Sequence, residues 1–149
     1  LKMEHYSPFE FAGATFLMEG VPVYTVRQMM RHRHFSFMER SLQHVQPEEK
    51  PETDPWIATD IFWAYRMALE IGKTKREARR YLPLCTPSTF LMSGNLRAWM
   101  EFVQKRTVLN AEPEIQEIAS SIQTQLAELF PNVIRTPIER DLNAEEAKE

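Results

Sequence analysis

Cationic and hydrogen-bonding side chains are concentrated in residues 27–41, whose sequence is RQMMRHRHFSFMERS. Arginine presents a planar fork of N–H donors that matches a phosphate or a carboxylate, and a stretch so rich in charge is costly to bury. Residues 31–34 are Arg-His-Arg-His, and no single face of a helix or strand can hold four consecutive side chains. The pattern favours a turn that surrounds an anionic group, with an exposed basic loop as the alternative.

Further arginines stand at or near the predicted ends of elements, at Arg79, Arg97 and Arg106. Each can hold a phosphate through two parallel hydrogen bonds, and each can equally be a surface or ion-paired residue. From the residues alone, the prediction is a local cationic site for a phosphorylated small molecule.

Other chemistries find less support in the sequence. It has no Walker loop, no GxGxxG and no HExxH. His32 and His34 lack the spaced partners that a metal site needs, so no metal is predicted. Ser41 lies beside the basic residues, but the sequence supplies neither the base nor the orienting acid of a serine triad.

Composition limits the class of protein. A chain of 149 residues that is 43% hydrophobic can form one domain with a real core. Its net charge of −3 argues against binding nucleic acid through a bulk positive field. Cys85 is the single cysteine, which favours a reducing, cytoplasmic location. The sequence shows neither a membrane-spanning run nor a signal peptide, so no membrane partner is predicted.

The elements that position these residues are predicted from periodicity and from caps. In the first third, Ser7-Pro8 marks a turn, and residues 11–19 form a strand buried on both faces and broken by Gly20. A helix follows from Pro22 to about residue 31, residues 35–41 are extended, and residues 45–54 form a loop.

The remainder is mostly helical. Asp54 caps a helix that ends at Gly72, and Thr74 caps a second one that stops before Pro83. Residues 88–93 form a strand, Asn95 caps a helix to residue 106, and Pro113 opens a last helix that ends at Pro131. The buried stripe of this last helix is predicted to be Ile115, Ile118, Ile122, Leu126 and Leu129. The predicted fold class is α+β.

The basic stretch resembles the signature of flavin-dependent thymidylate synthases. That family carries Arg-His-Arg, two variable residues, Ser, one variable residue, Asn, two variable residues, Ser, one variable residue and Arg-Tyr. Residues 31–33, Ser36 and Ser41 stand at the required spacing. Four further matches occur in the family's order and cover most of residues 5–120: His5 with Ser7-Pro8-Phe9-Glu10, Arg79 with Leu82-Pro83, Asn95-Leu96-Arg97 with Phe102 and Arg106, and Glu114-Ile115.

The resemblance implies a small antiparallel sheet flanked by helices, in a homotetramer whose active sites are shared between subunits. It implies a single domain over residues 1–138 and then a charged tail over residues 139–149. We expect the family's N-terminal strand and helices to be missing from this sequence, with a shortened relative as the alternative. FAD is the implied cofactor, NADPH the reductant and methylenetetrahydrofolate the one-carbon donor. The implied reaction methylates C5 of a pyrimidine nucleotide monophosphate, by default deoxyuridylate.

The same resemblance assigns roles to matching positions. The implied flavin contacts are His5, Ser7, Glu10, Arg31, His32, Arg33, His34, Asn95, Arg97 and Glu101. The implied nucleotide contacts are Gln28, Arg31, Glu39, Ser41, Gln43, Arg79, Arg106 and Asn110. Ser41 and Arg106 are the predicted catalytic residues, and Arg79 and Arg106 can clamp a phosphate or polarise a uracil carbonyl. The family is not thought to use an enzymic nucleophile on the pyrimidine ring.

Several positions depart from the family pattern. Met38 replaces the Asn, Leu42 a small residue and Gln43-His44 the Arg-Tyr, while Asn110 and Phe11 each replace a usual His. Most of these changes fall on the nucleotide side. Losing an arginine at position 43 removes a charge-assisted bond of roughly 1.5–3 kcal/mol. We therefore expect a retained flavin site and an altered nucleotide specificity, with uridylate or a modified uridylate as possible substrates.

Two other functions are open on the sequence alone. The departures at positions 38, 42 and 43 suit a non-catalytic relative that binds flavin or nucleotide. The third possibility is a plain interaction domain with a basic loop.

Overall fold

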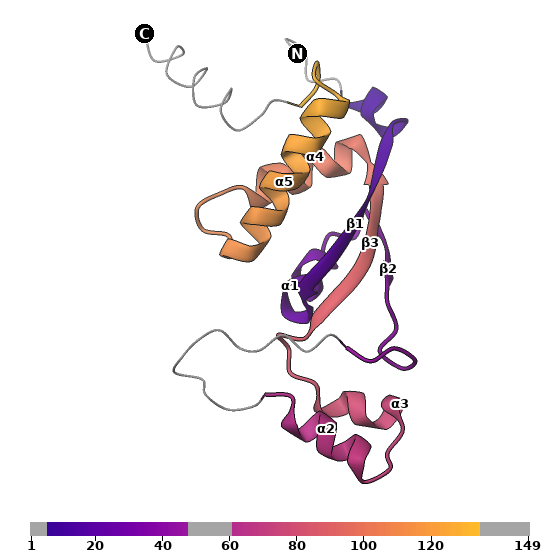
Figure 1. Ribbon diagram of the computed structural model, residues 1–149. Helices are drawn as coiled ribbons and strands as arrows, with labels where there is room; N and C mark the ends of the chain where they lie inside the picture. Colours follow the sequence, from indigo (N-terminus) through magenta and orange to yellow (C-terminus); the bar gives the residue numbers. More distant parts are fainter. Residues whose placement is uncertain (1–5, 48–60, 135–149) are drawn as a thin grey trace. The chain divides into compact units, whose positions relative to one another are not determined.

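A computed structural model of the chain describes residues 6–47 and 61–134. They divide between two compact units, one formed by residues 1–14 and 94–149 and the other by residues 15–93. Figure 1 shows the elements of both units along the chain. The expectation of a single domain over residues 1–138 stays a prediction, and the charged tail lies outside the described residues.

A three-stranded sheet lies mostly in the unit of residues 15–93. Its strand order is β1-β3-β2, from β1 (Gly13–Pro22), β3 (Pro87–Asn95) and β2 (Ser36–Glu39). β2 runs antiparallel to β3, with Ser36 opposite Ser93 and Glu39 opposite Phe90. The α+β class and the small sheet are confirmed.

β1 differs from its prediction in two ways. It was expected to be buried on both faces, yet its exposure alternates and Leu17 is 59% exposed. One face of an antiparallel sheet can remain open to solvent, so an apolar run does not require two covered faces. Nor does Gly20 break the strand: it adopts φ 69°, a conformation that glycine tolerates, and the strand continues to Pro22.

α1 (Val23–Met29) follows β1, with Pro22 as its N-cap residue, close to the predicted helix. α2 (Trp63–Glu70) is shorter than predicted, because Ile61 and Phe62 lie in a turn; the predicted cap Asp54 lies outside the described residues. The next predicted helix consists of α3 (Lys75–Ala78) and a 3₁₀ turn, η2 (Arg79–Tyr81). Thr74 caps α3 as predicted.

The unit of residues 1–14 and 94–149 contains the 3₁₀ turn η1 (Ser7–Glu10) and two longer helices, α4 (Leu96–Arg106) and α5 (Pro113–Leu129). α4 packs against both η1 and α5. The predicted cap at Asn95 and the predicted start at Pro113 are confirmed.

The core of this unit contains Trp99 and Phe102 of α4, whose rings meet edge to face at 5.8 Å. Ile115, Ile122 and Leu126 of α5 are buried as predicted. The predicted stripe is wrong at Leu129, which is 64% exposed. Leu129 is the last residue of the helix, and the last buried residue of α5 is Ala127.

None of the helices in the described part of the chain is long and apolar enough to cross a membrane.

Candidate functional site

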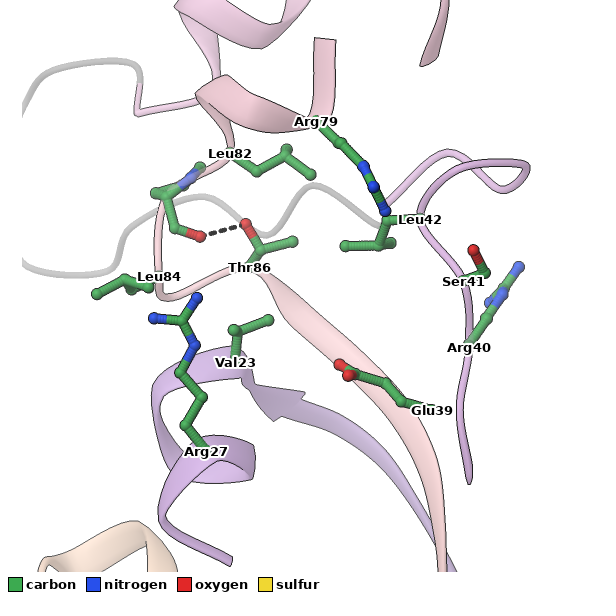
Figure 2. A pocket seen from close by; sticks show the side chains of 11 residues that line it. Val23, Arg27, Glu39, Arg40, Ser41, Leu42, Arg79, Leu82, Leu84 and Thr86 are labelled. Atoms are coloured by element: carbon green, nitrogen blue, oxygen red, sulfur yellow. Dashed lines mark hydrogen bonds between the residues drawn. The ribbon is translucent and has the colours of Figure 1, made fainter. Parts of the chain in front are cut away.

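A cavity of about 370 Å³ opens in the unit of residues 15–93 (Figure 2). This volume falls within the range of small-molecule sites. The side chains that line it are Val23, Arg27, Glu39, Arg40, Ser41, Leu42, Arg79, Leu82, Pro83, Leu84 and Thr86. They come from α1, from the end of β2, from η2 and from the segment that leads into β3.

Backbone hydrogen bonds attach the start of α1 to one wall of the cavity. The first N–H groups of a helix have no partner within the helix. Here Val23 N–H donates to the carbonyl of Thr86 at 3.0 Å, and Tyr24 N–H donates to that of Leu84 at 3.1 Å. The buried Thr86 hydroxyl donates to the Pro83 carbonyl at 2.6 Å. These bonds fix the wall against the helix that carries Arg27.

The opposite wall continues the edge strand. Beyond the end of β2, Arg40 N–H still donates to the Thr89 carbonyl at 2.9 Å, so the chain stays beside β3. It then turns at Ser41, whose hydroxyl accepts from Gln43 N–H at 3.3 Å. Glu39 and Ser41 are thereby presented along one edge of the cavity.

The charge of the lining suits an anion. Among the described lining residues, three arginines from three different segments accompany one carboxylate. In Figure 2, Arg27 and Arg79 extend toward the cavity from two sides, while Arg40 runs alongside Ser41 at the outer edge. Guanidinium groups bind phosphate oxygens through paired N–H donors. The arrangement can hold a phosphorylated ligand while Glu39 accepts a hydrogen bond from it.

Of the predicted nucleotide contacts, the cavity brings together Glu39, Ser41 and Arg79. Gln28 and Gln43 belong to the same unit but are not among the described residues that line it. Arg106 and Asn110 belong to the other unit, where Arg106 is half-buried near the end of α4 and Asn110 is exposed.

Two lining arginines, Arg27 and Arg40, were not predicted as site residues. A signal for Arg27 existed: it lies four residues after Val23, on the same face of the predicted helix. Arg40 occupies a variable position of the family signature, so the resemblance offered no signal for it.

The basic residues 31–34 do lie in a turn, and its predicted role around an anionic group stays a prediction. Residues 31–34 follow α1 in a turn, with Arg31 N–H donating to the Gln28 carbonyl at 3.2 Å. Arg31, Arg33 and His34 are exposed, as expected of groups that meet a ligand or solvent. The half-buried His32 ring instead meets Phe35 edge to face, with centroids 6.5 Å apart.

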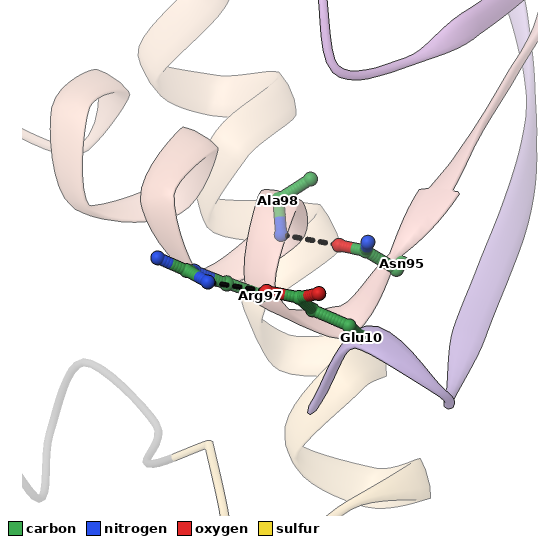
Figure 3. Close-up of polar contacts among 4 residues, drawn as sticks. All are labelled: Glu10, Asn95, Arg97 and Ala98. Atoms are coloured by element: carbon green, nitrogen blue, oxygen red, sulfur yellow. Dashed lines mark hydrogen bonds and ion pairs between the residues drawn. The ribbon is translucent and has the colours of Figure 1, made fainter. Parts of the chain in front are cut away.

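A second polar cluster lies in the other unit (Figure 3). Arg97, in the first turn of α4, forms an ion pair with Glu10 of η1. Asn95 accepts from Ala98 N–H through its side-chain oxygen at 2.9 Å, which leaves its NH₂ group as a donor. Both groups stand beside the link between the two elements, where Leu96 N–H donates to the Ala12 carbonyl at 2.7 Å.

The remaining predicted flavin contacts in this unit are dispersed. Ser7 is exposed at the start of η1, and Glu101 pairs with Lys105 one turn along α4. His5 lies outside the described residues. Arg97, Asn95 and Glu10 nevertheless offer the donors and the acceptor that the phosphates, ring carbonyls and ribityl hydroxyls of FAD require, so these residues fit the cofactor. Within residues 6–47 and 61–134, no group of three or more His, Cys, Asp or Glu could hold a metal.

Comparison with known proteins supplies independent information. The chain matches the family model described as thymidylate synthase complementing protein over residues 1–132. It is 28% identical to a flavin-dependent thymidylate synthase of Mycobacteroides abscessus, in an alignment that covers 89% of this chain and 65% of that protein. A protein of the same name from Haloarcula marismortui is 29% identical, with 85% and 68% covered.

A probable flavin-dependent thymidylate synthase of Paramecium bursaria Chlorella virus 1 is 28% identical, over 91% of this chain and 76% of the viral protein. The chain thus spans about two thirds to three quarters of the length of these relatives. Since the family model covers most of its length, the chain belongs to the thymidylate synthase complementing protein family.

Proposed function

We propose that this protein binds FAD and methylates C5 of a uridylate-type nucleotide, with methylenetetrahydrofolate as the one-carbon donor and NADPH as the reductant. Deoxyuridylate is the default substrate, and uridylate is the alternative. The observation that carries the proposal is the cavity in which Arg27, Arg79, Glu39 and Ser41 meet. Its charge and size suit a nucleotide monophosphate, Ser41 and Arg79 match motifs of the family, and the resemblance assigns Glu39 to the nucleotide as well.

In this proposal the two clusters have different tasks. Glu10, Asn95 and Arg97 hold the flavin, which supplies the redox chemistry when bound. Arg27 and Arg79 bind the phosphate or polarise a uracil carbonyl, and Ser41 donates a hydrogen bond from the cavity edge. Ser41 acts here by binding and not as a nucleophile; no histidine is among the described residues that line the cavity and could activate it.

The proposal includes a homotetramer with shared sites. Arg106 and Asn110 are not among the described residues lining this cavity, so in the proposal they complete the nucleotide site from another subunit. Arg106 would then polarise the pyrimidine. A cytoplasmic location belongs to the same proposal.

The function is tested in two steps. The purified protein, reconstituted with FAD if necessary, should show the visible absorption bands of a bound flavin. It is then incubated with methylenetetrahydrofolate, NADPH and, separately, deoxyuridylate or uridylate, and the products are identified by mass spectrometry. A C5-methylated product from deoxyuridylate or uridylate supports the proposal.

The second candidate function is a non-catalytic relative that binds flavin and nucleotide. It is favoured by Gln43, which stands where the family signature has an arginine and is absent from the described cavity lining. Flavin binding without any C5-substituted product would establish it. Absence of flavin bands, together with no nucleotide binding, would instead indicate an interaction domain with a basic turn.

A further inference from the structure

We infer that Ser88 is a positioning residue of the nucleotide site: its buried hydroxyl holds Glu39 so that one carboxylate oxygen accepts a hydrogen bond from the bound nucleotide. Neither the family signature nor the cavity lining includes Ser88. The inference rests on the proposed nucleotide substrate. It goes further by stating which kind of group on that substrate Glu39 binds, namely a hydrogen-bond donor.

The register of the sheet brings the two side chains together. Glu39 stands opposite Phe90 on the neighbouring strand, and Ser88 lies two residues before Phe90, on the same face. Diagonal neighbours of this kind are within reach of a long side chain. The Ser88 hydroxyl donates to Glu39 Oε1 at 2.6 Å. Ser88 is only 4% exposed whereas Glu39 is exposed, so the bond is closed to water on the serine side and open to a ligand on the carboxylate side.

This bond fixes which part of Glu39 is available. A serine hydroxyl has one proton to donate, and here the proton is directed at Oε1. Oε2 remains an acceptor, and Glu39 lines the cavity. In Figure 2 the carboxylate points away from Arg40 and Ser41, toward the side on which Val23 lies. A carboxylate held in place loses less side-chain freedom when a ligand binds.

Glu39 also differs in kind from its neighbours. Among the described residues that line the cavity it is the only acid, whereas the arginines offer N–H donors alone. A uridylate-type nucleotide carries its own donors at ring N3–H and at the sugar hydroxyl. The phosphate therefore belongs with the arginines and one of these donors with Glu39, which sets the direction in which the nucleotide lies. A ligand without that donor leaves the carboxylate without its hydrogen bond, so the site should bind such a ligand much more weakly.

The test is a thermodynamic cycle that combines a change in the protein with a change in the ligand. Binding of deoxyuridylate, N3-methyl-deoxyuridylate and 2′,3′-dideoxyuridylate is measured by calorimetry for the wild type and for Ser88→Ala. We expect Ser88→Ala to weaken deoxyuridylate binding about tenfold. We expect it to cause no further loss with the one analogue that lacks the donor bound by Glu39. Adding Ser88→Ala to Glu39→Gln should likewise change the affinity little.

Ser93→Ala is the matched control. Ser93 lies on the same strand, its hydroxyl is 2.7 Å from that of Thr15, and it is not among the described residues lining the cavity. It should leave all three affinities unchanged. An equal loss with all three nucleotides in Ser88→Ala, or no loss with any, would overturn the positioning role while leaving the proposed function intact. If the wild type bound no nucleotide at all, the proposed function and this role would both be wrong.

Discussion

The Glu10–Arg97 ion pair illustrates how single residues can serve a ligand more than the fold. Both side chains are about half exposed, at 46% and 54%. An ion pair in such a position contributes about 0–1 kcal/mol, because water and salt screen it. Its value to folding is therefore small, and its place beside Asn95 makes a binding role the better explanation.

Arg97→Ala should accordingly weaken the binding of the cofactor and leave the stability of the protein nearly unchanged. We expect FAD affinity to fall by roughly tenfold or more, because a charge-assisted contact to the flavin is lost. The melting temperature of the flavin-free protein should hardly change. Absorbance titration with FAD measures the first quantity and calorimetric unfolding the second. Gln104→Ala, at an exposed position of the same helix, should leave FAD binding unchanged. A large loss of stability with normal FAD affinity would show that the pair is structural.

Single residues also show what the sequence can and cannot predict. Ser41 and Arg79 match short motifs, and Glu39 lies within the signature; all three were predicted as nucleotide contacts from the resemblance, and they do share a cavity. Ser88 carries no such mark. Its contact with Glu39 depends on the register of β2 against β3, and register is fixed by packing across the sheet and not by residues near Ser88 in sequence.

Among the elements, α3 is short and depends on its cap. The backbone N–H and the hydroxyl of Thr74 both donate to Glu77 Oε2, at 2.9 and 2.8 Å, and the Thr74 hydroxyl accepts from Glu77 N–H at 3.3 Å. This capping box satisfies N–H groups that an α-helix leaves unpaired. The helix that it starts leads into η2, and so to Arg79.

The capping box predicts a dependence of stability on pH. The bonds from the Thr74 backbone and hydroxyl hold the pKa of Glu77 below its usual range. Because the folded-state pKa is the lower one, the carboxylate stabilises the folded protein above its unfolded pKa, and this contribution is lost as the pH falls through the folded pKa. Glu77→Gln should therefore be less stable at neutral pH and should lose less stability on acidification than the wild type.

Thermal unfolding at neutral and acidic pH measures this difference. Glu117→Gln, on an exposed position of α5, is the control and should follow the wild type. Parallel curves for the wild type and Glu77→Gln would contradict the linkage.

β1 and β3 approach each other closely at Gly13. A Cβ atom there would lie 2.8 Å from the Gly94 carbonyl oxygen, which is backbone and cannot move alone. Gly13→Ala should therefore lower the free energy of unfolding by about 1–3 kcal/mol, as overpacking does. Denaturant unfolding measures the change. A stability equal to that of the wild type would mean that the strands can separate at no cost.

Prediction at this scale succeeded where the determinant is local. Three helix starts were predicted correctly, because the residue that marks each start acts through its own side chain: Thr74, Asn95 and Pro113. The faces of β1 were not, because which face is covered depends on distant segments. Residues 11–19 were predicted to be buried on both faces. In the structure the burial of successive side chains alternates along the strand, and the polar Glu19 falls on an exposed position of that alternation.

At the scale of the whole molecule, the predicted site residues are divided between two compact units. The Glu10–Arg97 cluster lies in the unit of residues 1–14 and 94–149, and the cavity lies in that of residues 15–93. Motif order along the chain could not predict this division, because it depends on contacts between residues far apart in sequence. The division separates two arginines that the family resemblance assigns to one nucleotide: Arg79 lines the cavity, whereas Arg106 belongs to the other unit.

The central claim is that the cavity of residues 15–93 is the nucleotide site, with Arg79 as a phosphate ligand. Calorimetric titration of the FAD-loaded protein with deoxyuridylate tests it most directly, using the neighbouring exposed arginine as the control. Arg79→Ala should weaken binding roughly ten- to a hundredfold, the value of a charge-assisted hydrogen bond. Arg80→Ala, outside the described cavity lining, should bind like the wild type. Equal affinities for Arg79→Ala and the wild type would contradict the claim.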